Sequence, residues 1–471
     1  MPQHCSRGQQ WLVRRRPFVP SLGFILAFLI NVAPAVSQAE SSNALETRLE
    51  EVAKSYTSGN AFMGSVLVTE GEKILLNESF GSADLEWNIP NSADTKFRLG
   101  SLTKQFTAAL ILQLQQEGKL QTDAPVSKYL TDTPSAWGQI TLANLLGHTS
   151  GIPDFANDPS FGPWSMSPHS PTEEIAFFRD KPLMFAPGSR YEYSNSNFEV
   201  LGAVIEKVTG KHYADVLRER ILAPLAMNDS GLDADELILP RRAQGYVLSN
   251  GSLTHARNAS MTVPWAAGGM YSTTADLFRW EHGLFGGKLL SQATLKQMTT
   301  ARQGNYGLGV EVSTNTNLQV VRHGGAIDGF NSYLAYVPER QIAVIVLGNV
   351  AGTSAAGMAS QLLDVALGKQ IVLISEHRAV PITTSELRAF LGTFQFGSSF
   401  ALTFAVREDQ LTAAAPGESA LPLIYEGLRA GHPTFYAATV FAELEFIRDG
   451  SGEINTVILH QAGHDEIGRR H

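Results

Sequence analysis

The stretch that decides the fold of this 471-residue chain reads Arg98-Leu-Gly-Ser101-Leu-Thr-Lys104-Gln-Phe106. On a helix, the spacing S-x-x-K places the hydroxyl of Ser101 and the amine of Lys104 on the same face. A serine hydroxyl is a weak nucleophile until a neighbouring base accepts its proton, and a partly desolvated lysine can be that base. The helix amino terminus adds N–H groups beside a developing oxyanion. The alternative is a helix-capping serine beside a solvated lysine, so the motif needs support from elsewhere in the chain.

Two further motifs supply the other parts of such a site. Tyr191-Glu-Tyr193-Ser-Asn195 offers a phenol, whose pKa an adjacent ammonium would lower, and an amide that can hold a substrate carbonyl. His323-Gly-Gly325-Ala326 precedes a predicted strand. Glycines there let the strand edge approach a ligand, and a backbone N–H can complete an oxyanion hole. Taken alone, residues 191–195 could be an ordinary polar loop, and residues 323–326 could be a turn with a surface histidine.

In this order the three motifs resemble the pattern S-x-x-K, Y-x-N and K/H-x-G of the serine β-lactamase and penicillin-binding-protein superfamily. The resemblance is to its class C-like serine-hydrolase branch, peptidase family S12, and it spans roughly residues 45–368. It implies an α/β (α+β) fold, with an antiparallel sheet flanked by helices and an all-helical subdomain. Three longer stretches also look typical of that branch: Leu145-Leu-Gly-His148-Thr-Ser-Gly-Ile-Pro153, Pro187-Gly-Ser-Arg-Tyr-Glu-Tyr-Ser-Asn195 and Ala267-Gly-Gly-Met-Tyr-Ser272.

The resemblance also implies a role for each matching residue. Ser101 would be the acylated nucleophile, Lys104 its proton acceptor, and Tyr193 the group that passes the proton to the leaving group. Substrate contacts would come from Asn195, His323, Gly325 and Ala326, with the N–H groups of Ser101 and Ala326 holding the oxyanion. No metal or cofactor is implied. His148 is expected to be structural.

One residue departs from the β-lactamase pattern. Class C β-lactamases have lysine where this chain has His323, and a lysine stays cationic at neutral pH and can pair with the carboxylate of a penicillin. A histidine of ordinary pKa is mostly neutral there. The sequence therefore favours cleavage of an ester or amide, of the esterase, DD-peptidase or D-aminopeptidase type, over efficient β-lactam hydrolysis. The alternative is a catalytically silent protein of the same fold that binds penicillin or peptidoglycan fragments.

Apolar periodicity predicts how the elements are arranged around these motifs. Strands are expected at 62–69, 74–80, 332–337 and 342–349, and helices near 101–118, 196–210 and 355–367. Ser196-x-x-Glu199 predicts a capping box at the start of the second helix. Strands at both ends of this region and helices between them predict one sheet built from amino- and carboxyl-terminal segments.

Composition changes at both ends of the chain. Residues 1–39 combine Arg14-Arg15-Arg16, an apolar run at 22–30 and small residues before two candidate cleavage points, after Ala35 and Ala39. This predicts a removable export signal, of the Sec or twin-arginine type, and a periplasmic or extracellular bacterial protein without a stable membrane anchor. The predicted domains are 40–374 for the hydrolase, 375–385 for a linker, and 386–471 for a small all-β domain. That last domain resembles a lipocalin-like barrel, ending in a frayed polar tail.

Charge and cysteine content limit the possible partners. The chain has a formal charge of -9, and without residues 1–39 it would have 32 basic and 45 acidic residues. No cluster of lysine and arginine follows the signal, which argues against nucleic-acid binding. The single cysteine, Cys5, lies inside the signal, so the exported chain would have neither a disulfide nor a thiolate nucleophile. A small-molecule or peptide substrate with an ester or amide bond is the partner we expect.

Overall fold

The computed structural model describes residues 33–249, 251–257, 259–397, 400–418, 420–438, 440–461 and 464–471. The chain divides into two units, Met1–Asn43 and Ala44–His471. Residues 1–32, which hold most of the predicted export signal, lie outside the described residues; helix α1 (Ala33–Ser55) follows them. Among the described residues, no helix combines the length and the apolar character needed to span a bilayer.

A six-stranded antiparallel sheet forms the centre of the larger unit. Its strand order, β10-β11-β12-β13-β1-β2, places the first two strands directly beside four strands that come much later in the chain. In register, Val66 of β1 lies opposite Val346 of β13. The prediction of one sheet built from both ends of the hydrolase region is therefore confirmed. The strands are β1 (Gly64–Glu70), β2 (Lys73–Phe80), β10 (Glu311–Asn315), β11 (Leu318–Ile327), β12 (Phe330–Val337) and β13 (Ile342–Gly348).

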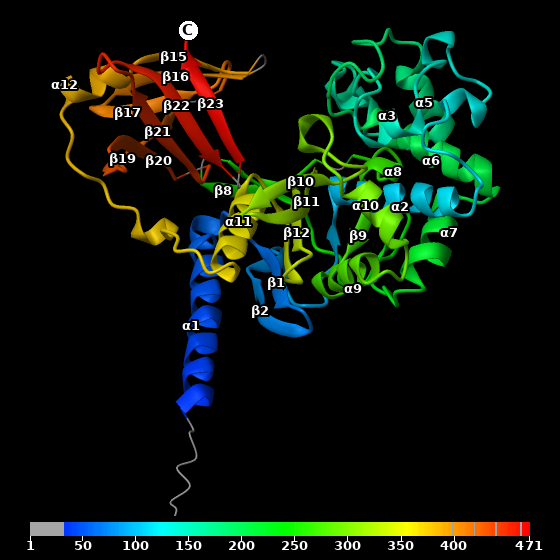
Figure 1. The fold of residues 1–471 in the computed structure, drawn as a ribbon, viewed down its shortest axis with the longest axis horizontal. Coiled ribbons are helices and arrows are strands. Elements are labelled where there is room, and N and C mark those ends of the chain that lie inside the picture. Colours follow the sequence, from blue (N-terminus) through cyan, green and yellow to red (C-terminus); the bar gives the residue numbers. More distant parts are fainter. Residues whose placement is uncertain are drawn as a thin grey trace, which may run out of the picture. The chain divides into compact units, whose positions relative to one another are not determined.

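The two faces of this sheet bury two separate hydrophobic cores. Alternate residues of a strand point to opposite faces, so Val66 and Val68 pack with the core that includes α1 and α11 (Ser354–Ala366), whereas Leu67 packs with the other core. That second core joins the sheet to the helical region, which contains α2 and α6 (Figure 1). Its helices are α2 (Thr103–Gln116), α3 (Leu142–Leu146), α4 (Phe161–Trp164), α5 (Pro171–Arg179), α6 (Ser196–Thr209), α7 (Tyr213–Leu217), α8 (Trp265–Gly268), α9 (Thr274–Phe285) and α10 (Gln292–Met298).

Short strands tie the loops of this region together. They form one three-stranded sheet in the order β14-β7-β8, a second in the order β5-β9-β6, and the pair β3-β4. Their bounds are β3 (Ser82–Asp84), β4 (Ile89–Pro90), β5 (Phe97–Arg98), β6 (Gly231–Leu232), β7 (Tyr246–Ser249), β8 (Ser252–His255), β9 (Met270–Ser272) and β14 (Val350–Ala351). The pairing of β5 with β9 brings Arg98 opposite Tyr271 and so fixes the chain just before Ser101.

The carboxyl-terminal residues form a nine-stranded, nearly closed antiparallel sheet around an aromatic core that contains Phe394, Phe404, Phe435 and Phe446. Edge-to-face contacts among these rings, such as 5.1 Å between the centroids of Phe404 and Phe446, fill its interior. The expectation of a small barrel-like β domain is confirmed. It comprises helix α12 (Thr384–Leu387) and strands β15 (Gly392–Phe396), β16 (Phe400–Arg407), β17 (Gln410–Ala414), β18 (Leu421–Pro422), β19 (Ile424–Arg429), β20 (His432–Ala437), β21 (Ala442–Arg448), β22 (Ile454–Gln461) and β23 (His464–Arg470).

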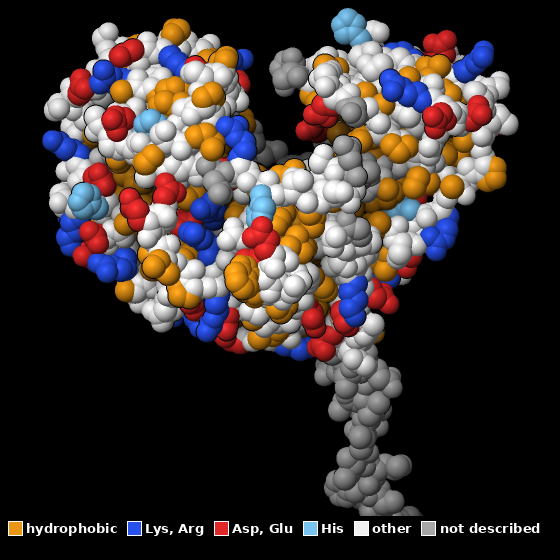
Figure 2. All heavy atoms as spheres, turned by 180° about the vertical axis from the view of Figure 1, so that it is seen from behind, with side chains coloured by type: hydrophobic (Ala, Val, Ile, Leu, Met, Phe, Trp, Pro, Cys, Tyr) orange, Lys and Arg blue, Asp and Glu red, His pale blue; other side chains and the backbone are white. Residues whose placement is uncertain are grey.

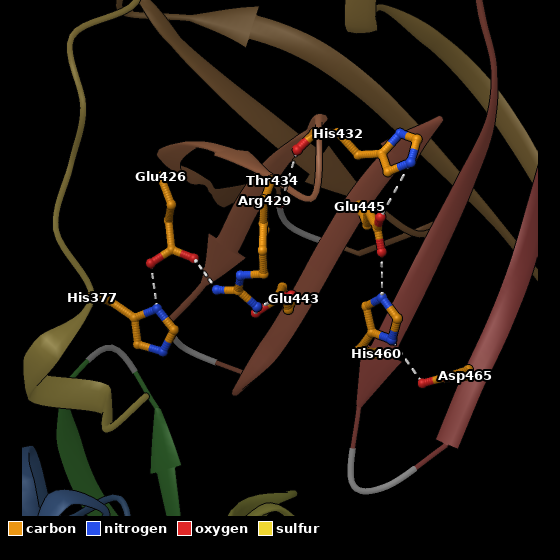
Figure 3. Close-up of polar contacts among 9 residues, drawn as sticks. All are labelled: His377, Glu426, Arg429, His432, Thr434, Glu443, Glu445, His460 and Asp465. Atoms are coloured by element: carbon orange, nitrogen blue, oxygen red, sulfur yellow. Dashed lines mark hydrogen bonds and ion pairs between the residues drawn. The ribbon is translucent and has the colours of Figure 1, made fainter. Parts of the chain in front are cut away.

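The expectation of a frayed polar tail is wrong. Strand β23 pairs with β22 on one side and with β15 on the other. The last strand of the β domain is therefore hydrogen-bonded to its first strand. Periodicity did not reveal this strand because its charged residues stand in adjacent pairs, Asp465-Glu466 and Arg469-Arg470, so apolar and polar residues do not alternate. On the polar face of strands β20 to β23, His460 hydrogen-bonds Asp465 at 2.7 Å and lies 3.3 Å from Glu445 (Figure 3). No group of His, Asp and Glu in the described part of the chain has a geometry that would hold a metal ion.

Basic and acidic side chains are mixed on the face of the molecule that Figure 2 shows. Many of them are paired across elements, for example Arg220 with Glu117 at 2.6 Å and Arg340 with Glu70 at 2.8 Å. Exposed pairs of this kind contribute little to stability, typically about 0–1 kcal/mol each. The two hydrophobic cores therefore dominate the stability of the hydrolase region.

Candidate active site

Two glycines seat Ser101 against strand β11. Ser101 lies in a 3₁₀ turn, Gly100–Leu102, that leads into α2. Gly100 has a φ of +55°, and a Cβ on it would lie 2.8 Å from the nitrogen of Ala326. A Cβ on Gly325 would lie 2.0 Å from the carbonyl oxygen of Leu99. A side chain at either position would push the 3₁₀ turn away from strand β11. The two glycines therefore allow the turn and the strand to lie in close contact.

The edge of β11 beside this turn is open. Strand β10 pairs with β11 only from Leu318 to Arg322, so the following residues extend past their neighbour on that side. Ala326 is exposed there, and its N–H lies on the Gly100 side of the strand. The first N–H groups of a helix also lack partners within the helix. The positions of Ser101 and Ala326 thus suit the two donors of an oxyanion hole.

Lys104 is fully buried and has three polar neighbours. Its Nζ lies 2.7 Å from Oδ1 of Asn195, 2.9 Å from the carbonyl oxygen of Ala267 and 3.0 Å from Oγ of Ser101. The first two neighbours can only accept hydrogen bonds. A neutral amine has two hydrogens and one lone pair, so donating to both leaves its lone pair for the hydroxyl of Ser101. As an ammonium, Lys104 donates to all three oxygens; once it loses a proton, its lone pair faces Oγ of Ser101 and can accept the serine proton.

Burial makes this neutral state accessible. It lowers the pKa of Lys104 to about 7, although the negative charges of Asp154 and Glu199 act in the opposite direction. An ordinary lysine, with a pKa near 10.4, would hold its proton at neutral pH and could not act as a base. Burial thus gives Lys104 a pKa near neutral pH, which is where a general base is most effective.

Tyr193 faces Ser101 from the loop before α6. Burial raises its pKa above the usual range, and the hydrogen bond to Ser101 only partly opposes this. Nζ of Lys104 lies 4.9 Å from the centre of its ring. An adjacent ammonium could have lowered the pKa of this phenol, but burial raises it instead. Tyr193 is a protonated phenol at neutral pH, and its chemistry is that of a proton donor.

His148 packs against the loop before α6 that contains Tyr193. Its ring lies 4.2 Å from that of Tyr193, centre to centre. Its Nδ1 accepts hydrogen bonds from the backbone N–H of Ser194 at 3.2 Å and from Nδ2 of Asn197 at 3.1 Å. Because Nδ1 accepts both, it carries no proton, and burial lowers the pKa of this imidazole well below its usual value. The structure thus places His148 as a support for the loop.

An aspartate that the sequence did not single out completes the chain of contacts behind Ser101. Nδ2 of Asn195 lies 3.0 Å from Oδ2 of Asp154, while its Oδ1 accepts from Lys104. These contacts fix which end of the amide faces the lysine. Burial raises the pKa of Asp154, opposed by the N–H of Ala156 and by the charge of Lys104. Asp154 directly follows Gly151-Ile-Pro153, but no local pattern marks it as part of the site.

His323 lies behind the wall of the site. Only 2% of its surface is exposed, whereas the sequence predicted a residue that lines the wall and binds substrate. Its Nδ1 lies 2.6 Å from the carbonyl oxygen of Gly324, which can only accept, so Nδ1 carries the proton. Nε2 then accepts from the hydroxyl of Tyr306 at 2.8 Å. Burial and the charge of Lys104 lower the pKa of His323 to about 3, so the imidazole is neutral.

A pocket of about 250 Å³ opens beside Ser101, and neither Tyr193 nor His323 is among its lining residues. Asn195 and Ala326 border it together with Ser101. Its walls are mostly apolar, formed by Phe155, Phe161, Val263, Pro264 and Ile327. Arg257 and Asp328 add opposite charges to the lining. Arg257 donates to the carbonyl oxygen of Gly162 at 2.7 Å, and Asp328 accepts from the N–H of Ala259 at 2.7 Å.

This fold and site define the class of protein. The family described as Beta-lactamase matches residues 50–367, and the chain belongs to that family. The D-aminopeptidase of Gluconobacter oxydans is 27% identical over 84% of this chain and 75% of that protein. The octameric penicillin-binding protein homologue from Pyrococcus abyssi has a TM-score of 0.64 and is 26% identical, covering 92% of this chain and all of that one. The D-amino acid amidase from Ochrobactrum anthropi SV3, complexed with L-phenylalanine amide, has a TM-score of 0.60 and is 27% identical over 70% of this chain and 98% of that one.

Proposed function

We propose that this protein is a serine hydrolase of peptidase family S12 that cleaves esters or amides through an acyl-enzyme on Ser101. The observation that carries the proposal is the position of the Lys104 amine, 3.0 Å from Oγ of Ser101 with its other two hydrogen-bond partners both acceptors. Lys104 accepts the serine proton as Oγ attacks the substrate carbonyl, and the N–H groups of Ser101 and Ala326 hold the oxyanion. Tyr193 passes the proton to the leaving group, and water then hydrolyses the acyl-enzyme.

The pocket beside Ser101 is the natural place for the acyl group. The leaving group must lie toward the proton donor Tyr193, and Tyr193 is not one of the residues that line this pocket. A volume of about 250 Å³ lies just below the usual range of ligand pockets and suits a small acyl group. Its apolar walls favour an alkyl or aryl acyl group of that size. We therefore propose short to medium apolar acyl esters or amides as the substrate class.

A D-aminopeptidase or amidase activity is the second candidate. The names of the Gluconobacter and Ochrobactrum relatives point in this direction. Asp328 in the lining of the pocket supplies a carboxylate that attracts an ammonium group on the acyl side. A DD-peptidase remains within the same proposal, because it uses the same acyl-enzyme. A silent binding protein would have no chemical need for the Ser101–Lys104 contact.

Efficient β-lactam hydrolysis is disfavoured by His323. A penicillin carries a carboxylate, and the neutral, buried imidazole gives it no cation at the start of the third motif. We also propose that the protein is exported to the periplasm or secreted, on the basis of the basic and apolar residues at its amino terminus.

A substrate panel tests the proposed class. We expect kcat/KM for p-nitrophenyl esters to rise from acetate to hexanoate by about threefold to fourfold per methylene and to level off once the pocket is filled. Amides of D-amino acids should be cleaved more slowly, and nitrocefin weakly or not at all. Steady-state kinetics on the same preparation measure all three. Rapid nitrocefin turnover would contradict the role given to His323, and kcat/KM independent of chain length would contradict the acyl pocket.

A further inference from the structure

Asp154 is held firmly in place behind the active site. The buried hydroxyl of Ser196, in the first turn of α6, donates to the carbonyl oxygen of Pro153 at 2.8 Å and accepts from the N–H of Phe155 at 3.0 Å. It therefore fixes the peptide units on both sides of Asp154 against α6. The predicted capping box between Ser196 and Glu199 is wrong, because the hydroxyl of Ser196 makes these two contacts instead and Glu199 turns inward.

A chain of hydrogen bonds runs from this aspartate to the amine of Lys104. Nδ2 of Asn195 donates to Oδ2 of Asp154 at 3.0 Å and to Oδ1 at 3.3 Å. At the other end of the same amide, Oδ1 of Asn195 accepts from Nζ of Lys104 at 2.7 Å. An amide donates at one end and accepts at the other, whereas a carboxylate only accepts. Asp154 therefore determines that Asn195 turns its oxygen, and not its NH₂ group, toward the lysine.

The hydrogen bonds of Asp154 match an ionised carboxylate. Besides the contacts from Asn195, its Oδ1 accepts from the N–H of Ala156 at 3.1 Å, so both of its oxygens accept from N–H donors. Burial raises the pKa of Asp154, whereas these hydrogen bonds and the charge of Lys104 act against that rise. The contact with Ala156 also caps the 3₁₀ turn Phe155–Asn157, and two residues of this turn line the acyl pocket. One side chain thus contacts both the wall of the pocket and the amide beside the base.

The other titratable groups that face Lys104 carry little charge at neutral pH. They come from four elements: Glu199 on α6, Tyr193 in the loop before α6, His148 after α3 and His323 on β11. Burial raises the pKa of Glu199 well above the ordinary value for glutamate, so this carboxyl group is mainly protonated. Tyr193 is a protonated phenol, and both histidines are neutral. The negative charge that acts on Lys104 at neutral pH is therefore mainly that of Asp154.

We propose that Asp154 is a positioning residue that fixes the amide of Asn195 and stabilises Lys104 as an ammonium once it has accepted the serine proton. The proposal rests on the proposed function, in which Lys104 is the base. During acylation the proton moves from Oγ of Ser101 to Nζ of Lys104 as Oγ bonds to the substrate carbonyl carbon. Asp154 neither gains nor loses a proton in this step. Its negative charge and the aligned dipole of Asn195 favour the positive charge that forms on the buried amine.

Two substitutions remove the charge of Asp154 while keeping different parts of its contacts. Asp154→Asn keeps the length of the side chain and an oxygen that can accept from Asn195. Asp154→Ser is too short to reach that amide, but serine is a favourable capping residue for the turn that follows. The negative charge of Asp154 raises the pKa of Lys104, so the acid limb of the kcat/KM profile should move to lower pH in both variants. A purely structural role predicts the opposite sign, because a loosened loop would hydrate Lys104 and return its pKa toward the ordinary value near 10.4.

The experiment compares pH profiles of p-nitrophenyl ester hydrolysis for the wild type, both variants and the control Asp158→Asn. Asp158 lies in the same segment but pairs with Lys181 and does not line the acyl pocket. In both Asp154 variants we expect the midpoint of the acid limb to fall by about one pH unit. The plateau of kcat/KM should fall roughly threefold to tenfold, because a weaker base accepts the serine proton less readily.

The control should keep the wild-type profile, and all variants should keep the wild-type preference for acyl chain length, which reports an intact pocket wall. An acid limb that moves to higher pH, or that does not move, in folded Asp154→Asn and Asp154→Ser would overturn the proposal. A shift of equal size in Asp158→Asn would also overturn it, because the effect would then not depend on the contact with Asn195.

A second measurement does not depend on catalysis. Titration of ε-¹³C-lysine-labelled protein by NMR, with the Lys104 signal assigned from Lys104→Met, reports the pKa of this amine directly. A lower Lys104 pKa in both Asp154 variants is the expected result, and an unchanged or higher pKa would overturn the role of Asp154. If the wild-type enzyme shows no acyl transfer at all, the proposed function fails, while the NMR titration still tests the link between Asp154 and Lys104.

Discussion

Replacing Ser101 with alanine is expected to lower kcat/KM for p-nitrophenyl hexanoate by a factor on the order of 10⁴–10⁶. Ser101 is the hydroxyl 3.0 Å from the Lys104 amine, and a chain without residues 1–39 has no cysteine that could replace it. The side chain is small and partly exposed, so its loss leaves the core intact. Initial rates at saturating and limiting ester measure the effect.

The matched control is Ser135→Ala, an exposed serine at the start of a short 3₁₀ turn. Its kcat/KM should equal that of the wild type, and both variants should have wild-type circular dichroism. Substantial residual turnover by folded Ser101→Ala, above the uncatalysed rate and insensitive to acylating inhibitors, would mean that another residue is the nucleophile.

Replacing Lys104 with methionine is expected to lower kcat/KM by about 10²–10⁴, the usual contribution of a general base. Methionine keeps most of the volume of the side chain but cannot accept the proton of Ser101. In the wild type, kcat/KM should rise with pH through an acid limb near pH 7, where Lys104 loses its proton. That limb should be absent in the variant. Lys128→Met, at an exposed lysine, is the control and should retain both rate and limb.

Thermal unfolding provides an independent test of the same lysine. Because the pKa of Lys104 is about 7 in the folded protein and near 10.4 when unfolded, the unfolded state binds more protons between these values. Wild-type stability should therefore increase with pH across this window, relative to Lys104→Met. The difference in unfolding free energy should change by several kcal/mol, on the order of 4 kcal/mol, from pH 7 to pH 10. A difference independent of pH would contradict the lowered pKa.

The sequence predicted the parts of the site that depend on local spacing. Ser101 and Lys104 stand three residues apart at the start of a helix, and the structure brings them together with Tyr193 and Asn195. The shared sheet and the carboxyl-terminal β domain also followed from periodicity and turn signals. The Ser101–Lys104 pair, the strands and the helices are set by short-range patterns, whereas the grouping with Tyr193 and Asn195 followed from the family resemblance.

What could not be predicted depends on burial by distant segments. Glu199 has the spacing of a capping residue, yet its helix buries it against α8. His323 looks like a wall residue in its motif, yet Tyr306 and the carbonyl group of Gly324 occupy both of its nitrogens. Periodicity predicts which face of an element is apolar, but the solvent exposure and pKa of a single polar side chain depend on contacts across the fold.

The central claim is that Ser101 becomes covalently acylated with Lys104 as its base. Intact-mass analysis after exposure to a fluorophosphonate tests this most directly, with Ser101→Ala and Lys104→Met as parallel samples. We predict one adduct per chain in the wild type, located on the peptide that contains Ser101, a much slower adduct in Lys104→Met, and none in Ser101→Ala. An adduct that persists in Ser101→Ala, or no adduct in folded wild-type protein with any acylating or phosphonylating reagent, would contradict the account.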